Sequence, residues 1–192
     1  MRVDPPNRLL DATLEIQQFC QDRRWRFCFI GGLAAQHWGE ARLTRGADLT
    51  LFTGIGDEPR YVDDLLGHFP SRLADARAFA LGHRVLLLSA TNGIPLDVTL
   101  GALPFEDKAV SAARSEEIVT GVRLVLAGPG ALVVFKAFAN RPQDWLDIDG
   151  IIAKSGRMID WNEVHSDLDN LLDLKGDRSA LGRLDDLRSR LQ

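Results

Sequence analysis

The sequence predicts an α+β fold, in which a mixed sheet flanked by helices is followed by a helical C-terminal lobe. Short apolar runs typical of strands concentrate in residues 25–127, whereas residues 131–192 show only helical periodicity. The chain has 192 residues, of which 45% are hydrophobic and 26% charged, so it has enough apolar material for a core. We therefore expect an α+β core over residues 1–127 and a helical lobe over residues 128–192.

Helices and short strands alternate over the first 67 residues. Helical spacing of apolar residues predicts the helices, and short aromatic or aliphatic runs predict the strands. Pro5 and Pro6 keep the first helix from extending backwards, Gly31-Gly32 ends the first strand, and Gly39 closes the second helix. In chain order the expected elements are the helix Asn7–Arg24, the strand Trp25–Ile30, the helix Leu33–Trp38, the strand Ala47–Phe52 and the helix Asp57–Gly67.

A hairpin and one further strand complete the predicted sheet. Thr91-Asn92-Gly93 separates two apolar runs, Arg84–Ala90 and Ile94–Leu100, and Asn-Gly in that setting is the strongest short-range signal of an antiparallel hairpin. A helix over Pro104–Ala113 and a last strand over Val122–Ala127 follow. After Gly128-Pro129-Gly130 the expected elements are the helices Ala131–Ala139, Gln143–Lys154, Trp161–Leu172 and Arg178–Leu191.

Composition and charge argue against several classes of protein. The net charge is -4, with 23 Lys+Arg against 27 Asp+Glu, whereas a DNA-coating protein would be strongly basic. No run approaches the roughly 18 apolar residues of a membrane helix, and the polar N-terminus is unlike a secretory signal. Cys20 and Cys28 lie among apolar neighbours, so we expect buried free thiols and a cytoplasmic location.

Three polar features are expected where the sheet meets the helices. Gly31-Gly32 stands at a strand-to-helix turn, where the backbone can approach a phosphate closely, although a tight turn without a ligand gives the same pattern. Asp48 and Asp97 each interrupt an apolar strand, and alternation turns them away from its apolar face. Asp48 could simply face solvent. If the strands are neighbours, the two carboxylates meet and would bind Mg²⁺, which prefers oxygen ligands.

The order of these features resembles the nucleotidyltransferases of the DNA polymerase β superfamily, and within it the AbiEii-like group, which includes toxin nucleotidyltransferases. The residues that carry the resemblance are Gly31-Gly32, Arg42-Leu43-Thr44, Asp48-Leu49, Asp97, Leu103-Pro104-Phe105-Glu106 and a helix motif with Lys136, Arg141, Asp144 and Asp147. They span roughly residues 25–155, most of the chain.

The resemblance implies transfer of a nucleoside monophosphate from an NTP to a hydroxyl of RNA, of a protein or of a small molecule. Two divalent ions, Mg²⁺ or Mn²⁺, would bind the triphosphate and stabilise the leaving pyrophosphate. It assigns metal binding and catalysis to Asp48 and Asp97, with Asp97 as the base, and a phosphate clamp to Lys136. The implied nucleotide-binding residues are Gly31, Gly32, Arg42, Thr44, Lys136, Arg141 and Asp144. A cognate antitoxin is an expected partner.

One position departs from the family pattern, because its first metal-binding aspartate falls at Gly46. Losing a group that merely orients a metal ligand already costs about 10–100-fold in affinity or activity. The chain is therefore a relative that only binds nucleotide or nucleic acid, a weak or one-metal enzyme, or a sequence variant of an active protein. Asp57, Glu58 or Glu40 could supply the missing carboxylate from a loop, but no spacing favours any of them.

The C-terminal motif residues also have purely structural interpretations. Lys136 could run along its apolar helix and carry its ammonium to solvent. Arg42 could form an ion pair, and Asp144 could cap or pair on a helix surface.

Overall fold

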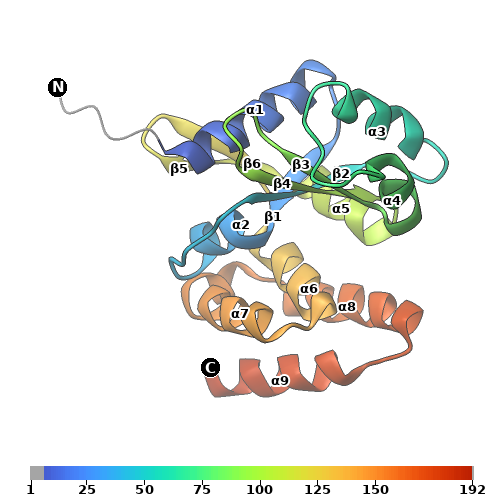
Figure 1. The fold of residues 1–192 in the computed structure, drawn as a ribbon. Coiled ribbons are helices and arrows are strands. Elements are labelled where there is room, and N and C mark those ends of the chain that lie inside the picture. Colours follow the sequence, from blue (N-terminus) through green and yellow to red (C-terminus); the bar gives the residue numbers. More distant parts are fainter. Residues whose placement is uncertain (1–6, 192) are drawn as a thin grey trace.

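Over residues 7–191, which the computed structural model describes, nine α-helices surround a mixed six-stranded sheet (Figure 1). This is the α+β class that the sequence predicts. In their order across the sheet the strands are β3 (Val85–Ser89), β4 (Pro95–Gly101), β2 (Ala47–Phe52), β1 (Phe27–Ile30), β6 (Val122–Leu126) and β5 (Arg114–Val119). The pairs β2–β4 and β1–β6 are parallel, and the other neighbours are antiparallel.

The helices lie on both sides of the sheet. Their bounds are α1 (Arg8–Asp22), α2 (Gly31–Trp38), α3 (Glu58–Leu66), α4 (Ala76–His83), α5 (Pro104–Ala112), α6 (Pro129–Ala139), α7 (Pro142–Ser155), α8 (Trp161–Lys175) and α9 (Ser179–Leu191), with a 3₁₀ turn at Gly156–Met158. In Figure 1, α1 and α3 lie above the sheet, and α6 to α9 gather below it. Among the described residues, none of the helices combines the length and the apolar character needed to cross a membrane.

The two faces of the central strands differ in character. Leu49 of β2 and Val98 of β4 are fully buried in the main core, as the alternation of these strands requires. Asp48 and Asp97 point to the opposite face and are only partly buried. One face of the sheet therefore carries the main core, while the other has a small core cluster around Cys28 and Val110 and leaves Asp48 and Asp97 in a polar setting. Cys20 and Cys28 are both buried free thiols, and burial raises the pKa of each to about 12.

Two elements are not among those predicted. The strand β5 is an exposed edge strand of sequence Arg-Ser-Glu-Glu-Ile-Val, so it lacks a strong apolar alternation and depends on its pairing with β6. The helix α4 is only eight residues long, too short for its periodicity to stand out. The helix α2 begins at Gly31 rather than Leu33, because Gly31 takes a φ of +65° and the chain turns at once into the helix. Pro5 and Pro6, the expected limit of the first helix, lie outside the described residues.

The helix α1 is fastened to the sheet by a buried amide. The strand β1 pairs with β6 only at Leu126, so backbone groups further along that edge of β6 need other partners. Gln17, which is 7% exposed, supplies them: its Nε2 donates to the carbonyl of Arg123 and its Oε1 accepts from the N–H of Val125, both at 2.9 Å. One side chain thus satisfies two backbone groups of the sheet.

We expect Gln17→Ala to lower the free energy of unfolding by about 1–3 kcal/mol, because two backbone groups are left without partners. Urea denaturation followed by circular dichroism measures the change. Gln18→Ala is the matched control, since Gln18 lies on the exposed side of the same helix and pairs only with Asp22. Equal stability of the two variants would contradict this role of Gln17.

Candidate functional site

Two aspartates lie side by side on the polar face of the sheet. The strands β2 and β4 run parallel, and their register pairs Asp48 with Asp97. The N–H of Gly32 donates to Oδ2 of Asp48 at 3.4 Å, a long bond. Burial and the nearby carboxylate of Asp97 raise the pKa of Asp48, and the Gly32 N–H, Lys136 and Arg141 offset this rise only in part. Burial and repulsion from Asp97 thus both oppose the charge on Asp48, and a bound cation would relieve both.

The glycine pair allows α2 to approach these side chains. A Cβ atom at Gly31 would lie 2.1 Å from Oδ2 of Asp48, and one at Gly32 would lie 2.4 Å from Oγ1 of Thr44. No side chain fits at either position. The Thr44 hydroxyl accepts a hydrogen bond from Nε2 of Gln36 at 2.8 Å, which ties the loop before β2 to α2. The close approach expected at these glycines is thus made by the protein's own Asp48 and Thr44.

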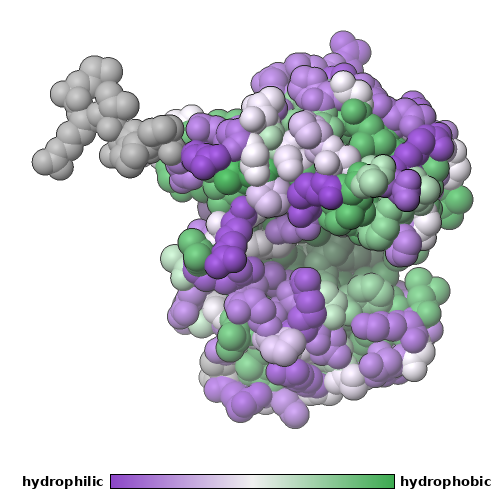
Figure 2. Space-filling model, viewed as in Figure 1, coloured by the Kyte–Doolittle hydropathy of each residue, from purple (hydrophilic) through white to green (hydrophobic). Residues whose placement is uncertain are grey.

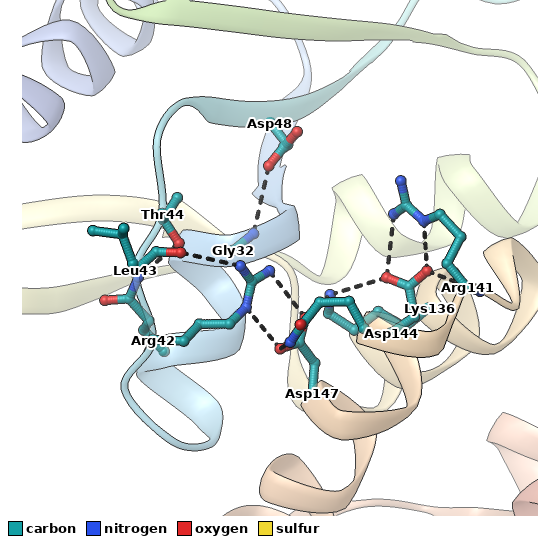
Figure 3. Close-up of polar contacts among 11 residues, drawn as sticks. Gly32, Arg42, Leu43, Thr44, Asp48, Lys136, Arg141, Asp144 and Asp147 are labelled. Carbon is teal, nitrogen blue, oxygen red and sulfur yellow. Dashed lines mark hydrogen bonds and ion pairs between the residues drawn. The ribbon is translucent and has the colours of Figure 1, made fainter.

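A buried ionic cluster forms the opposite wall of the site (Figure 3). Lys136 of α6 is 4% exposed, and its Nζ lies 2.5 Å from Oδ2 of Asp147 and 3.5 Å from Oδ1 of Asp144. Arg141 donates to both oxygens of Asp144, at 2.7 and 3.2 Å. Arg42 donates to both oxygens of Asp147, at 2.7 and 3.0 Å, from the loop before β2. The cluster therefore joins α6 and α7 to the loop before β2.

This cluster decides between the structural interpretations of its members. Lys136 does not extend to solvent, because its ammonium is enclosed between two carboxylates. Arg42 forms an ion pair, one of the two outcomes expected for it. Asp144 accepts from the backbone N–H of Arg141 at 3.2 Å and so caps α7, but it is buried rather than on the helix surface. Asp147, a motif residue given no role of its own above, is the one that binds both Lys136 and Arg42.

Two adjoining cavities converge on the aspartate pair. The larger, of about 460 Å³, lies between the sheet and the α6–α7 wall, and its lining includes Gly31, Gly32, Arg42, Lys136, Arg141 and Asp144. The smaller, of about 310 Å³, follows the loop that contains Thr44 and Gly46. Asp48 and Asp97 line both. In Figure 2 a hollow separates the upper part of the molecule, which contains the sheet, from the lower, helical part. The larger cavity has the size of a small-molecule or cofactor site.

The donor set fits one divalent cation better than two. Within residues 7–191, no three His, Cys, Asp or Glu side chains gather into a group that could hold a metal ion. None of the proposed substitutes for the missing aspartate lines either cavity: Asp57 pairs with Arg60 at 3.2 Å, Glu58 pairs with Arg84, and Glu40 lies beside α7. Asp48 and Asp97 remain as oxygen donors of the type that Mg²⁺ prefers.

One residue at the site has no signal in the sequence. Arg72, in the loop between α3 and α4, places its guanidinium against Oδ1 of Asp97. The two residues are 25 positions apart, and no motif or periodicity marks Arg72. Only the folded position of the loop beside β3 brings it to the aspartate pair.

Comparison with known proteins identifies the fold. No family model matches the sequence, and no curated protein matches it. Among solved structures, an antigenic nucleotidyltransferase-like protein from Paracoccidioides brasiliensis aligns over 91% of this chain and 92% of its own, with 18% identity and a TM-score of 0.54. The lincosamide antibiotic adenylyltransferase LnuA, with lincomycin bound, aligns over 73% of this chain and 94% of its own, at 11% identity and a TM-score of 0.50. The antibiotic-resistance factor ANT(2'')-Ia aligns over 87% and 92%, at 17% identity and a TM-score of 0.50. The chain therefore has a nucleotidyltransferase fold.

The ionic cluster predicts a pH-dependent contribution to stability. Burial opposes the ionisation of Asp147, but hydrogen bonds from Lys136 and Arg42 outweigh it and lower the pKa of Asp147. Such a carboxylate stabilises the fold fully at pH values above its unfolded pKa of about 3.9, and this contribution is lost as the pH falls through the lower folded value. We expect Asp147→Asn to lower the free energy of unfolding by about 3 kcal/mol at pH 7, because it leaves buried cations poorly compensated.

Urea denaturation between pH 2.5 and 7 measures this difference, which should shrink below about pH 4. Asp149→Asn is the control, since Asp149 is exposed on the same helix. A pH-independent difference between Asp147→Asn and the unaltered protein would contradict the assignment.

The aspartate pair predicts the opposite sign for Asp48. Because the pKa of Asp48 is raised in the folded protein, its charge destabilises the fold at pH values above the unfolded pKa of about 3.9. We expect Asp48→Asn to raise the free energy of unfolding at pH 7 by about 1 kcal/mol, as removal of strained functional groups often does. Thermal denaturation measures the gain. Asp97→Asn should show none, since it takes a partner from Arg72. A lower melting temperature for Asp48→Asn than for the unaltered protein would refute the expectation.

Proposed function

We propose that the protein binds a nucleoside triphosphate together with a divalent cation and transfers the nucleoside monophosphate to a hydroxyl acceptor. The observation that carries this proposal is the in-register pair of Asp48 and Asp97 at the junction of two cavities, facing a wall with an excess of cations. The cation that these carboxylates would hold neutralises charge on the phosphates. The nucleotidyltransferase fold agrees with the proposal without specifying a substrate.

We assign different roles to the charged residues of the site. The Arg141 side chain is 73% exposed, so its guanidinium is free to contact phosphate oxygens. Lys136, expected above as a direct phosphate clamp, has its ammonium paired; we propose that it positions Asp144 and Asp147 instead. Asp97 accepts the proton of the acceptor hydroxyl while the oxygen of that hydroxyl bonds to the α-phosphorus. The bond from the α-phosphorus to the bridging oxygen breaks, and pyrophosphate leaves.

A small molecule is the acceptor class that we propose. The smaller cavity, about 310 Å³, shares both aspartates with the larger one and lies within the size range of small-ligand sites. One protein of similar fold is an adenylyltransferase of lincosamide antibiotics. RNA and protein acceptors, and a cognate antitoxin as partner, follow only from the narrower resemblance to the AbiEii-like group, which rests on the motif residues alone.

Binding without turnover is the second candidate, and Gly46 favours it. A Cβ atom at Gly46 would lie 2.8 Å from the carbonyl oxygen of Pro95 and 3.1 Å from its Cβ. A carboxylate at this position would therefore require the neighbouring strand end to shift. The packing around Gly46 thus fits glycine and not the first aspartate of the family pattern, which favours binding without turnover.

Transfer of α-labelled nucleotide tests the two candidates. All four NTPs are offered with Mg²⁺ or Mn²⁺ to a panel of hydroxylated small molecules, total RNA and total protein. We expect labelled product from the unaltered chain and a loss of at least about 10–100-fold in Asp97→Asn. Asp64→Asn is the matched control, because Asp64 also pairs with an arginine, Arg23, but lies far from the site in an exposed pair.

Nucleotide binding without any labelled product would exclude the transfer reaction and support the second candidate. Product formed only by Gly46→Asp would lead to the same conclusion, since it would show a pocket disabled at one ligand. Failure to bind any NTP would exclude both candidates.

A further inference from the structure

The backbone holds Arg72 beside the aspartate pair. The N–H of Arg72 donates to the carbonyl oxygen of Leu87 at 3.0 Å, and the preceding Ser71 forms a bridge with Leu88. Leu87 is in turn the register partner of Asp97 across β3 and β4. The loop that carries Arg72 is therefore attached to the strand next to Asp97, and the contact of its guanidinium with that carboxylate follows from this attachment.

Arg72 differs from the other cations of the site in its partner. Arg42, Lys136 and Arg141 each pair with carboxylates of α7, whose side chains are almost fully buried. Arg72 pairs with Asp97, whose side chain is 44% exposed and itself belongs to the aspartate pair. Arg72 contacts Asp97 through Nη2 alone, so its other guanidinium donors are available to a ligand whether or not a cation is bound. Its planar, five-donor group is suited to contact two phosphate oxygens at once.

Glycine at position 46 and Arg72 both make the net charge of the site more positive. Compared with a site that has a carboxylate at position 46 and no arginine, glycine removes one negative charge and Arg72 adds one positive charge. Together the two changes make the site more positive by two charges, which is the charge of one divalent cation. Gly46 packs closely against Pro95, so the fold leaves no space for a carboxylate at position 46.

We propose that Arg72 takes the place of a second cation, so that a bound nucleoside triphosphate is held by one divalent ion on Asp48 and Asp97 and by the Arg72 guanidinium on its phosphates. This inference rests on the proposed function and adds a phosphate-binding residue to it. It predicts one divalent ion per bound nucleotide. It also predicts that part of the nucleotide affinity survives when divalent ions are removed.

Calorimetry with a non-hydrolysable ATP analogue tests this, with Mg²⁺ and again in EDTA. We expect Arg72→Ala to weaken analogue binding about 10–100-fold under both conditions, and Arg72→Lys to restore part of it. Paramagnetic resonance of Mn²⁺ with the analogue should count one bound ion. Arg77→Ala is the matched control, because Arg77 follows in the next helix and pairs with Asp63 in an exposed ion pair. Thermal denaturation of each variant confirms that it is folded.

The possible results separate the inference about Arg72 from the proposed function. Tighter binding of the analogue by Arg72→Ala would show that the guanidinium hinders nucleotide binding instead of contacting the phosphates, and would overturn the inference. Unchanged binding by that variant, or two Mn²⁺ ions per nucleotide, would also overturn it while leaving the proposed function intact. Failure of the unaltered chain to bind the analogue or any natural NTP, with or without divalent ions, would reject the proposed function and the inference together.

Discussion

The register between β2 and β4 is the constraint on which the site depends. A shift of one residue would turn Asp97 to the apolar face and leave Asp48 without its neighbour. The buried face prevents such a shift, because Leu49 and Val98 occupy paired positions in the core. Core packing on one side of the sheet thus sets the electrostatics on the other. The same pairing runs on to β3, where Leu87 lies opposite Asp97 and accepts the bond that holds Arg72.

The ionic cluster has a different task from the aspartate pair. Its three cations all pair with its two carboxylates and so place α6 and α7 against the loop before β2, while the exposed side of Arg141 remains accessible to a ligand. Buried ion pairs add little net stability compared with apolar packing, yet losing one partner is costly. The cluster therefore specifies one position of the wall. Its excess of one positive charge faces Asp48 and is part of what keeps the pKa of that residue from rising further.

Most of the fold follows from local sequence signals, whereas part of the site does not. The hairpin around Gly93 and the long helices were predictable because each carries its own periodicity or turn residues. The edge strand β5 was not, since charged residues conceal its pairing. Alternation placed Asp48 and Asp97 on one face, but only the topology makes their strands neighbours. Burial of Lys136 and the approach of Arg72 to Asp97 depend on contacts between distant segments, which no local pattern records.

The balance of charge around the aspartate pair explains why Gly46 and Arg72 belong together. Three carboxylates on one sheet face repel one another strongly unless cations are bound, and with only two present, burial and repulsion from Asp97 already raise the pKa of Asp48. Glycine at position 46 limits that repulsion, and Arg72 compensates Asp97 from within the chain. Such a site can fold without a bound metal ion. Its need for a divalent cation then arises from the phosphates of the ligand, so the cation is expected to bind tightly only when the nucleotide is present.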